Sequence, residues 1–377
     1  MKIIVAMDSF KGSLTSLQAG EAVMRGLKEH LPDAQIQVLQ IADGGEGSLK
    51  AIAASGGYLQ MQASAVNPRG SLRKAEFLMS GGHAVIELAS ASGMNTLSPD
   101  DLNPLLTSTY GTGQLIKNAL RLDCRQITLC VGGSATNDGG MGLLSALGYR
   151  FLDSESRELQ PCGGNLIKIA IIDNSQVLKE LKDTKFTVAC DVDAPFIGPN
   201  GATRVFGPQK GATPEMIEQL EAGMTHFADL TEQFTGVRLH DLNGAGAAGG
   251  VSGAMKAYLG AEFRPGVEII LDALNFNDII RNAELVITGE GRMDAQSLMG
   301  KAPVGILRRC QARGIPVVGF AGSVENPEAL IKAGFRDVLP IQDGSRPLQE
   351  MMRTPVATAN LQNAAAQFAL GLSASRP

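Results

Sequence analysis

The sequence predicts an α/β protein of two domains, and three observations support this expectation. Both ends of the 377-residue chain alternate short apolar runs with helical repeats, which is typical of parallel sheets covered by helices. The middle of the chain is less regular and carries most of the Gly-rich and Pro-rich loops. The 45 glycines follow no fixed period, which excludes a collagen-like repeat. We therefore expect a discontinuous parallel-sheet domain at residues 1–83 and 284–377, with a second α/β domain inserted at residues 84–283.

The N-terminal region is expected to run strand, helix, strand, helix. Lys2–Met7 (KIIVAM) is an apolar strand candidate. Thr15, with Gln18 three residues later, forms a capping box that begins a helix. A second strand at residues 37–42 leads into a Gly-rich loop and a helix that ends near residue 55. This alternation indicates a parallel sheet.

The rest of the chain supplies the remaining elements in order. Strands are expected near residues 58–66, 71–79, 84–88 and 127–131, and again at 284–288, 315–321 and 337–341, with helices at 303–312 and at the alanine-rich C-terminus. Hinges are expected near residues 80–86 and 282–288, where the chain would cross between the domains. The cleft between two domains is the usual place for a ligand.

The composition excludes several classes of function. The net charge of −5, the absence of Trp and a count of only 4 Tyr argue against a nucleic-acid partner. No apolar stretch reaches the roughly 18 residues that a membrane span needs. The five scattered cysteines contain no CxxC pair and fit reduced thiols. We expect a cytoplasmic protein, a monomer or small homo-oligomer, that acts on small molecules.

The segment Gly132–Gly142 (GGSATNDGGMG) carries the strongest local signal. It follows the apolar run Ile127–Val131 and precedes a helical pattern at residues 143–148. Glycines let several backbone N–H groups point to one spot, and a helix N-terminus adds partial positive charge. The segment therefore suits a phosphate or a carboxylate, although a tight strand-to-helix turn with an Asp or Asn cap explains it equally well.

Acidic residues follow the predicted strands repeatedly. They are Asp8, Asp43, Asp191, Asp193 and Glu290. One such acid is usually a cap or turn residue, but ligands of open α/β sheets bind beyond the carboxyl ends of the strands. Carboxylates with few His or Cys nearby are hard oxygen donors, which suit Mg²⁺ carried on phosphates.

Basic residues share these loops and complete the chemistry of phosphoryl transfer. They are Lys11, Arg204, Lys210, Arg292 and Lys301. Phosphoryl transfer depends on positioning and on neutralising the charge that develops on the transferred group. Each cation taken alone is better explained by a solvated surface charge.

One motif points to a different cofactor. Gly244–Gly249 (GAGAAG) matches the dinucleotide fingerprint GxGxxG. The preceding run, residues 237–242, is short and charged, whereas the fingerprint follows a buried strand. A helix packed closely on a neighbour explains the small residues better. The four histidines lie outside the Gly-rich loops, so neither a catalytic triad nor a His-based metal site is expected.

Six long motifs together resemble those of the bacterial glycerate kinases, two-domain enzymes without a Walker A loop. The motifs are DSFKGS at Asp8–Ser13, ADGGEG at Ala42–Gly47, GGSATNDGG at Gly132–Gly140, FGPQKGAT at Phe206–Thr213, GAGAAGG at Gly244–Gly250 and ITGEGRMD at Ile287–Asp294. Their order and spacing match the family from residue 1 to beyond residue 340. The resemblance implies ATP-dependent phosphorylation of D-glycerate, generally at the 2-hydroxyl, in the breakdown of glyoxylate or sugar diacids. It also implies a Rossmann-like or flavodoxin-like domain made from both chain ends.

Roles are assigned to these residues as hypotheses. The residues expected to hold a phosphate group or the glycerate carboxylate are Asp8, Ser9, Gly132, Gly133, Ser134, Thr136, Asn137, Asp138 and Lys210. Lys11 and Arg292 are expected to bind the substrate carboxylate or the transferring phosphoryl group. Asp191 is the first candidate for the general base, and Asp43 the second. Asp8, Glu290 and Asp294 are expected beside Mg²⁺ that is carried with ATP.

Two other classes of function stay open at this point. A nicotinamide-dependent dehydrogenase of a hydroxy acid would use the GAGAAG segment and would bind NADH. A non-catalytic nucleotide sensor would keep the phosphate loops and turn nothing over. The motifs also leave open whether the product is 2- or 3-phosphoglycerate, and which loop binds ATP.

Overall fold

The structure is a computed structural model, and it describes residues 1–42, 44–45, 47–294, 297–299, 301–342, 344 and 346–374. The chain divides into two compact units. Unit 1 comprises Met1–Asp43, Lys50–Ser55 and Val267–Pro377, and unit 2 comprises Gly44–Leu49 and Gly56–Gly266. Within the described ranges, no helix combines the length and the apolar character needed to span a membrane.

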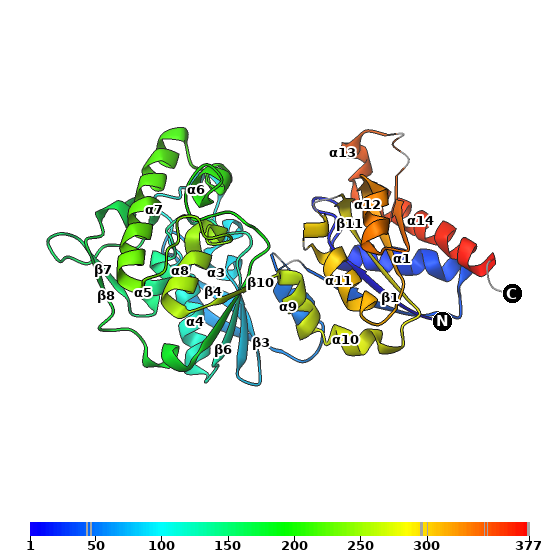
Figure 1. Cartoon of the computed structure of the whole chain (residues 1–377), viewed down its shortest axis with the longest axis horizontal. Helices are drawn as coiled ribbons and strands as arrows, with labels where there is room; N and C mark the ends of the chain where they lie inside the picture. The colour runs from blue at the N-terminus through cyan, green and yellow to red at the C-terminus, as the bar shows by residue number, and fades with distance from the viewer. Residues whose placement is uncertain are drawn as a thin grey trace. The chain divides into compact units, whose positions relative to one another are not determined.

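Unit 1 is built on a sheet of five parallel strands. These are β1 (Lys2–Met7), β2 (Gln35–Gln40), β11 (Leu285–Met293), β12 (Val317–Val324) and β13 (Asp337–Pro340), in the spatial order β13-β12-β11-β1-β2 (Figure 1). Every pairing in this sheet is parallel. Counted along the chain within unit 1, the order is the 2-1-3-4-5 of flavodoxin-like doubly wound sheets. The pairing of β1 with β11 joins the two ends of the chain in one sheet.

Helices complete unit 1. They are α1 (Ser16–His30), α9 (Gly266–Ala273), α10 (Phe276–Ile279), α11 (Ala302–Gln311), α12 (Pro327–Ala333), α13 (Leu348–Met351) and α14 (Thr354–Ala374), while α2 (Ser48–Ala53) begins in unit 2 and ends in unit 1. The predicted capping box at the start of α1 is confirmed, because Thr15 and Gln18 exchange side-chain and backbone hydrogen bonds. Helices α1 and α14 lie side by side (Figure 1), and a Cβ at Gly26 would lie only 2.1 Å from the Gln362 carbonyl oxygen. This close helix packing therefore needs glycine.

Unit 2 contains a mixed six-stranded sheet. Its spatial order is β10 (Glu262–Arg264), β9 (Lys185–Ala189), β6 (Gln126–Cys130), β5 (His83–Glu87), β4 (Leu72–Ser80) and β3 (Leu59–Val66). The first four of these strands are parallel, and β4 and β3 continue the sheet as an antiparallel hairpin. Because parallel strands end at one edge, the segments that follow β5, β6, β9 and β10 lie at the same edge of the sheet.

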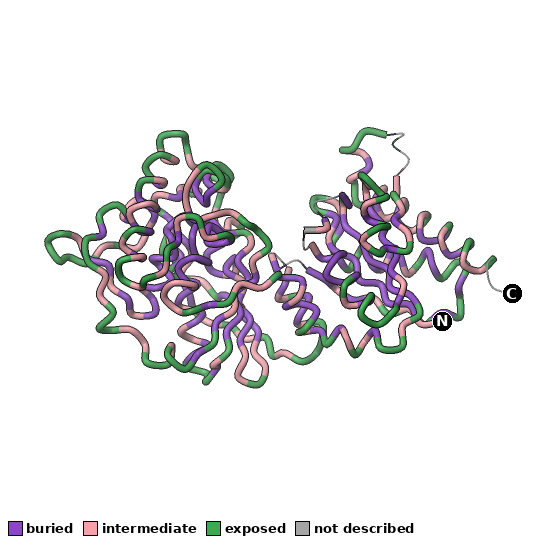
Figure 2. The backbone as a smooth tube through the Cα atoms, viewed as in Figure 1, coloured by how far each residue is buried: buried purple, intermediate pink, exposed green. Residues whose placement is uncertain are grey.

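The remaining elements of unit 2 surround this sheet. They are the helices α3 (Ala89–Ser92), α4 (Tyr110–Arg121), α5 (Met141–Ala146), α6 (Ala202–Phe206), α7 (Pro214–Thr235) and α8 (Val251–Leu259), and the two-stranded ribbon of β7 (Arg150–Leu152) and β8 (Ile171–Asp173). Phe227 on α7 stacks against Phe196 inside the core. Figure 2 shows the central strands of each unit as buried backbone.

The predicted α/β class is confirmed, and strands from both chain ends form one parallel sheet. The division into units differs from the predicted boundaries at residues 83/84 and 283/284. The hairpin β3–β4 pairs with β5 and so belongs to unit 2, and the second division falls between Gly266 and Val267.

The largest difference in a predicted strand end concerns β11. The sequence predicted a strand at residues 284–288, yet β11 continues to Met293. The reason is tertiary pairing: Glu290 and Arg292 lie opposite Ala321 and Ser323 of β12. Strand pairing overrides the weak strand preference of glycine here.

Candidate active site

In unit 1 the strand order reverses between β1 and β11, and the loops at such a point are the usual ligand site of a doubly wound sheet. Asp8 follows β1 directly, and its backbone N–H donates to the Gly289 carbonyl oxygen at 2.8 Å. Glu290 is the next residue along β11. Both carboxylates are buried, with Asp8 at 5% and Glu290 at 8% exposed surface. The carboxyl ends of β1 and β11 thus bring together two acids that lie 282 residues apart in the sequence.

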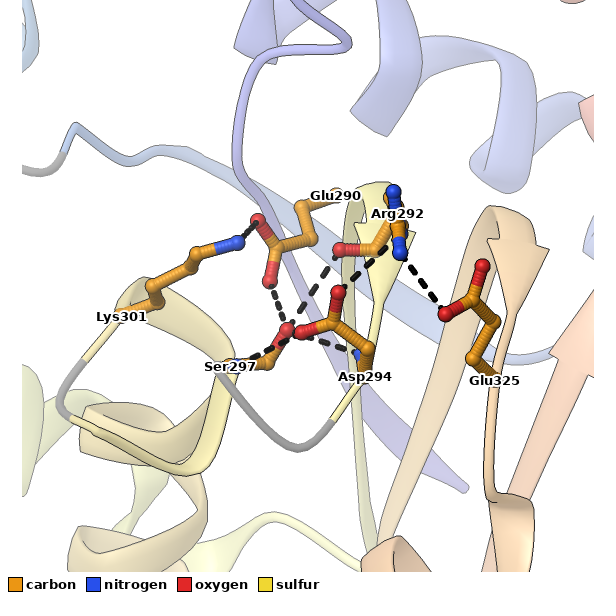
Figure 3. Close-up of polar contacts among 6 residues, drawn as sticks. All are labelled: Glu290, Arg292, Asp294, Ser297, Lys301 and Glu325. Atoms are coloured by element: carbon orange, nitrogen blue, oxygen red, sulfur yellow. Dashed lines mark hydrogen bonds and ion pairs between the residues drawn. The ribbon is translucent and has the colours of Figure 1, made fainter.

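The Glu290 carboxylate is held on both oxygen atoms (Figure 3). The Ser297 hydroxyl donates to Oε1 at 2.7 Å, and the Lys301 ammonium donates to Oε2 at 3.1 Å. Ser297 is fully buried, whereas the Lys301 side chain is 42% exposed. A buried carboxylate is stable only when it is paired in this way.

Alternation along β11 places Glu290 and Arg292 on one side of the strand, and Asp294 follows directly after the strand end. The Arg292 guanidinium contacts Asp294 Oδ2 at 3.0 Å and Glu325 Oε2 at 2.7 Å (Figure 3). Arg292 is 58% exposed, so a charged ligand has access to it.

The loop after β1 contains both the buried Asp8 and the exposed Lys11. The Ser9 N–H donates to Asp8 Oδ1 at 2.7 Å, which fixes that carboxylate. Lys11 is exposed in a tight turn closed by a bridge between Phe10 and Leu14. Gly12 has a φ of +76° in this turn, a conformation that favours glycine.

The described residues contain no group of three or more His, Cys, Asp or Glu that could hold a metal ion. Glu290 and Asp294 are hard oxygen donors, but they already pair with Lys301 and Arg292. Mg²⁺ in nucleotide-dependent enzymes typically uses one or two carboxylates together with phosphate oxygens and water. The donor set therefore fits a cation brought in on a nucleotide, and does not form a complete cage by itself.

In unit 2, Asp191 stands at the carboxyl edge of the sheet, directly after β9 and the connecting Cys190. It is exposed, and its Oδ1 accepts the N–H of Gly266 at 2.9 Å. Gly44 packs against the same place, since a Cβ there would lie 2.7 Å from the Gly266 Cα. Gly44 and Asp191 thus lie at one edge of the unit 2 sheet. Asp43, the second candidate base, lies outside the described residues.

The Gly132–Gly142 loop is mostly interior. Of its residues, Gly132 and Gly133 reach the surface, while Ser134 and all the residues after it are buried. A short bridge pairs Ser134 with Gly93. The backbone at Gly132 and Gly133 is therefore the part of the loop that a ligand can reach directly.

Asp138 holds this loop together. Its carboxylate accepts from the Thr109 N–H at 2.7 Å, from the Thr109 hydroxyl at 2.8 Å, and from the N–H groups of Gly140 and Gly142. These bonds join the start of α5 to the start of α4. Burial raises the pKa of Asp138, and the four hydrogen bonds oppose that effect.

The Lys210 side chain is buried beside the Gly132–Gly142 loop. It is 1% exposed, and its Nζ donates to the Thr136 carbonyl oxygen at 2.7 Å. Burial lowers the pKa of Lys210 to about 7, although the nearby Asp138 charge acts in the opposite direction. Thr136 Oγ1 and Asn137 Oδ1 are buried without a hydrogen-bond partner in the described chain. Lys210 and the polar residues of the loop therefore form a buried polar cluster behind the exposed glycines.

The GAGAAG segment packs against that cluster. A Cβ at Gly249 would lie 2.2 Å from the Thr136 carbonyl oxygen, and the Gly139 N–H donates to the Gly249 carbonyl oxygen at 2.9 Å. Ala248 adopts a left-handed conformation with φ of +53°. Residues 236–243, which precede this segment, form no strand. This geometry favours close packing over a dinucleotide-binding turn.

Three residues of these sites were missed from the sequence. Ser297 and Glu325 contact the β11 carboxylates and Arg292, and Glu87 accepts the Leu49 N–H at 2.8 Å at the end of the Gly44–Leu49 segment. No local motif marks Ser297 or Glu325 as partners. Glu87 was detectable in principle, since it is an acid near the end of the predicted strand at residues 84–88.

Several known proteins that are similar to this chain are named glycerate kinases. The family model described as "Glycerate kinase family" matches residues 3–372. A glycerate kinase of Bacillus subtilis (strain 168) is 44% identical over 93% of this chain and 92% of its own length. A glycerate 2-kinase of Escherichia coli (strain K12) is 39% identical over 99% of both chains. The crystal structure of a protein assigned as glycerate kinase 2 from Salmonella typhimurium LT2 has a TM-score of 0.84 and 40% identity, covering 99% of this chain and 98% of that one.

The buried Lys210 predicts a pH dependence of stability. The pKa of Lys210 is about 7 in the folded chain, against about 10.4 for a solvated lysine. Between these values the unfolded chain binds the extra proton, so the free energy of unfolding rises with pH, by up to about 1.4 kcal/mol per pH unit. Urea unfolding should therefore show the wild type gaining stability relative to Lys210→Met between pH 7.5 and 9. The exposed Lys182→Met is the control and should keep the pH dependence of the wild type. The same pH dependence of the free energy of unfolding in Lys210→Met and Lys182→Met would contradict the assignment.

Proposed function

Because the chain belongs to the glycerate kinase family, we propose that it transfers the γ-phosphoryl group of ATP to the 2-hydroxyl of D-glycerate. The products are ADP and 2-phospho-D-glycerate. The observation that carries this proposal is the 39% identity, over 99% of both chains, to a protein named glycerate 2-kinase. The carboxylates Glu290 and Asp294, which pair with Lys301 and Arg292 near the end of β11, support this proposal, because phosphoryl transfer depends on such charges.

In unit 1, Asp8, Glu290 and Asp294 are the proposed neighbours of Mg²⁺ carried on ATP. The metal ion would neutralise charge on the phosphate oxygens. Lys11 and the exposed Arg292 would neutralise the transferring phosphoryl group or bind the glycerate carboxylate. Ser9 holds Asp8 through its backbone N–H.

In unit 2, Asp191 is the proposed general base. As the 2-hydroxyl oxygen attacks the γ-phosphorus, the bond to the β–γ bridging oxygen breaks and the hydroxyl proton passes to Asp191. The hydrogen bond from Gly266 fixes Oδ1 of this carboxylate. An exposed position and an orientation set by this hydrogen bond suit a residue that must accept a proton from a substrate.

The Gly132–Gly142 loop is proposed to bind an anion through the exposed backbone of Gly132 and Gly133, with Ser134 at its edge. Thr136, Asn137, Asp138 and Lys210 would support that binding from behind, by holding the loop in shape. The proposed anion is a phosphate group or the glycerate carboxylate. A cytoplasmic location and a place in glyoxylate or sugar-diacid breakdown are further parts of the proposal.

The reaction itself is the first test. Incubation with Mg-ATP and D-glycerate should release ADP, and NMR of the product should show 2-phosphoglycerate. The absence of ADP above background would rule out the kinase proposal, and 3-phosphoglycerate as the product would overturn the choice of hydroxyl. NADH consumption without ATP would instead support the dehydrogenase alternative.

Asp191→Asn tests the proposed base. The amide cannot take the hydroxyl proton, so kcat should fall by about a hundredfold or more, while the thermal unfolding midpoint stays near that of the wild type. Asp193→Asn is the matched control, because it removes the same charge two residues along the same exposed segment and should leave kcat close to normal. A near-wild-type kcat for Asp191→Asn would remove Asp191 from the reaction.

A further inference from the structure

Ser297 lies at the centre of the polar network in Figure 3. It is fully buried and begins a short 3-10 helix, Ser297–Met299, seven residues after Glu290. Its Oγ is 2.7 Å from Glu290 Oε1 and 3.1 Å from the Asp294 backbone nitrogen. Its own backbone N–H donates to Asp294 Oδ1 at 3.1 Å. Ser297 thus touches both acidic residues of the β11 end.

The direction of these hydrogen bonds follows from what each group can do. A carboxylate oxygen only accepts, and a backbone N–H only donates. The single hydroxyl proton of Ser297 therefore goes to Glu290, and its oxygen accepts the Asp294 N–H. The Arg292 carbonyl oxygen competes for that proton from 3.4 Å, a much weaker geometry. The short O–H···O⁻ contact with Glu290 has the length of a charge-assisted bond.

The two partners of Glu290 differ in rigidity. Lys301 reaches Oε2 on a long side chain that is 42% exposed, so solvent screens this ion pair. The Ser297 contact is buried, and the Ser297 backbone is tied to Asp294 by hydrogen bonds of its own. Ser297 is therefore the partner that fixes where Glu290 Oε1 points.

We propose that Ser297 is the positioning residue that holds the Glu290 carboxylate in its working orientation for phosphoryl transfer. The proposal rests on the function given above, because it assigns Ser297 to that same site. Displacements of about 1 Å in a catalytic group cost up to about a hundredfold in rate, and outer partners of metal-binding carboxylates contribute roughly ten- to a hundredfold. A buried hydroxyl that fixes one carboxylate oxygen can supply an effect of this size.

The rival explanation is that the hydrogen bonds between Ser297 and Asp294 only stabilise the local backbone. That role predicts a loss of stability with little effect on kcat. Ser297→Ala removes the hydroxyl, Ser297→Thr restores it, and Thr288→Val is the matched control. Thr288 is also fully buried and lies on β11, but its hydroxyl donates to the Ala6 carbonyl oxygen rather than to a carboxylate.

The test combines kinetics with a double-mutant cycle. Ser297→Ala should lower kcat about ten- to a hundredfold with little change in the KM for D-glycerate, and Ser297→Thr should recover most of the loss. In the Glu290→Gln background, Ser297→Ala should cost little more, because Ser297 acts through Glu290. Thr288→Val should lower the unfolding midpoint and leave kcat within about twofold. If Ser297→Ala does not fold, Ser297→Cys keeps the volume with a weak donor and should show the same loss of kcat.

A second measurement does not depend on turnover. Binding of Mn²⁺ in the presence of ADP, followed by electron paramagnetic resonance, should weaken at least severalfold in Ser297→Ala and stay near the wild type in Thr288→Val. If the wild type fails to phosphorylate D-glycerate, the proposed function fails, and this binding measurement alone decides the role of Ser297. A folded Ser297→Ala with unchanged kcat and unchanged Mn²⁺ binding, or an additive double-mutant cycle, would overturn the proposal.

Discussion

The pairing of β1 with β11 is the constraint on which unit 1 and its site depend. Residues 3–7 run parallel to residues 285–289, so the two ends of the chain form one sheet. The Asp8 N–H and the Thr288 hydroxyl each add a bond across this pair, to Gly289 and Ala6. Because the two strands are parallel, their carboxyl ends lie at the same edge, and that edge carries Asp8 and Glu290. The sheet pairing therefore supports the fold and collects the acids at one point.

Local sequence patterns predicted most of this sheet. Lys2–Met7 was found with its observed limits, and the helix that follows begins at Ser16, directly after the Thr15 cap, because the capping box satisfies its first backbone N–H groups. The end of β11 was not predictable locally, since the pairing with β12 carries the strand through Gly289 and Gly291. The unit boundary near Gly56 arises because the hairpin β3–β4 pairs with β5. This pairing is a tertiary contact that local sequence does not determine.

In the candidate site, too, local sequence predicted some features, and contacts between segments determined the others. The sequence named Glu290, Arg292 and Asp294 as site residues. It did not show the alternation of Glu290 and Arg292, because the strand was expected to end at residue 288, whereas β11 runs to Met293. It did not show their partners either, because Ser297 and Lys301 lie beyond the strand and Glu325 follows β12. The Gly132–Gly142 motif shows the converse. Its polar residues suggest ligand contacts, yet Asp138 is buried, and Lys210 reaches the loop backbone from another segment. The glycines at 139 and 249 let two loops pack closely.

The central claim of this account is that the carboxyl ends of β1 and β11 carry the charge chemistry of the reaction, with Glu290 at their centre. The most direct test is the kcat of Glu290→Gln, which keeps the shape of the side chain and removes its charge. The account predicts a fall of about a hundredfold or more with a thermal unfolding midpoint near that of the wild type, while Glu328→Gln on the exposed start of α12 stays normal. A folded Glu290→Gln enzyme with a kcat within a few-fold of the wild type would contradict it.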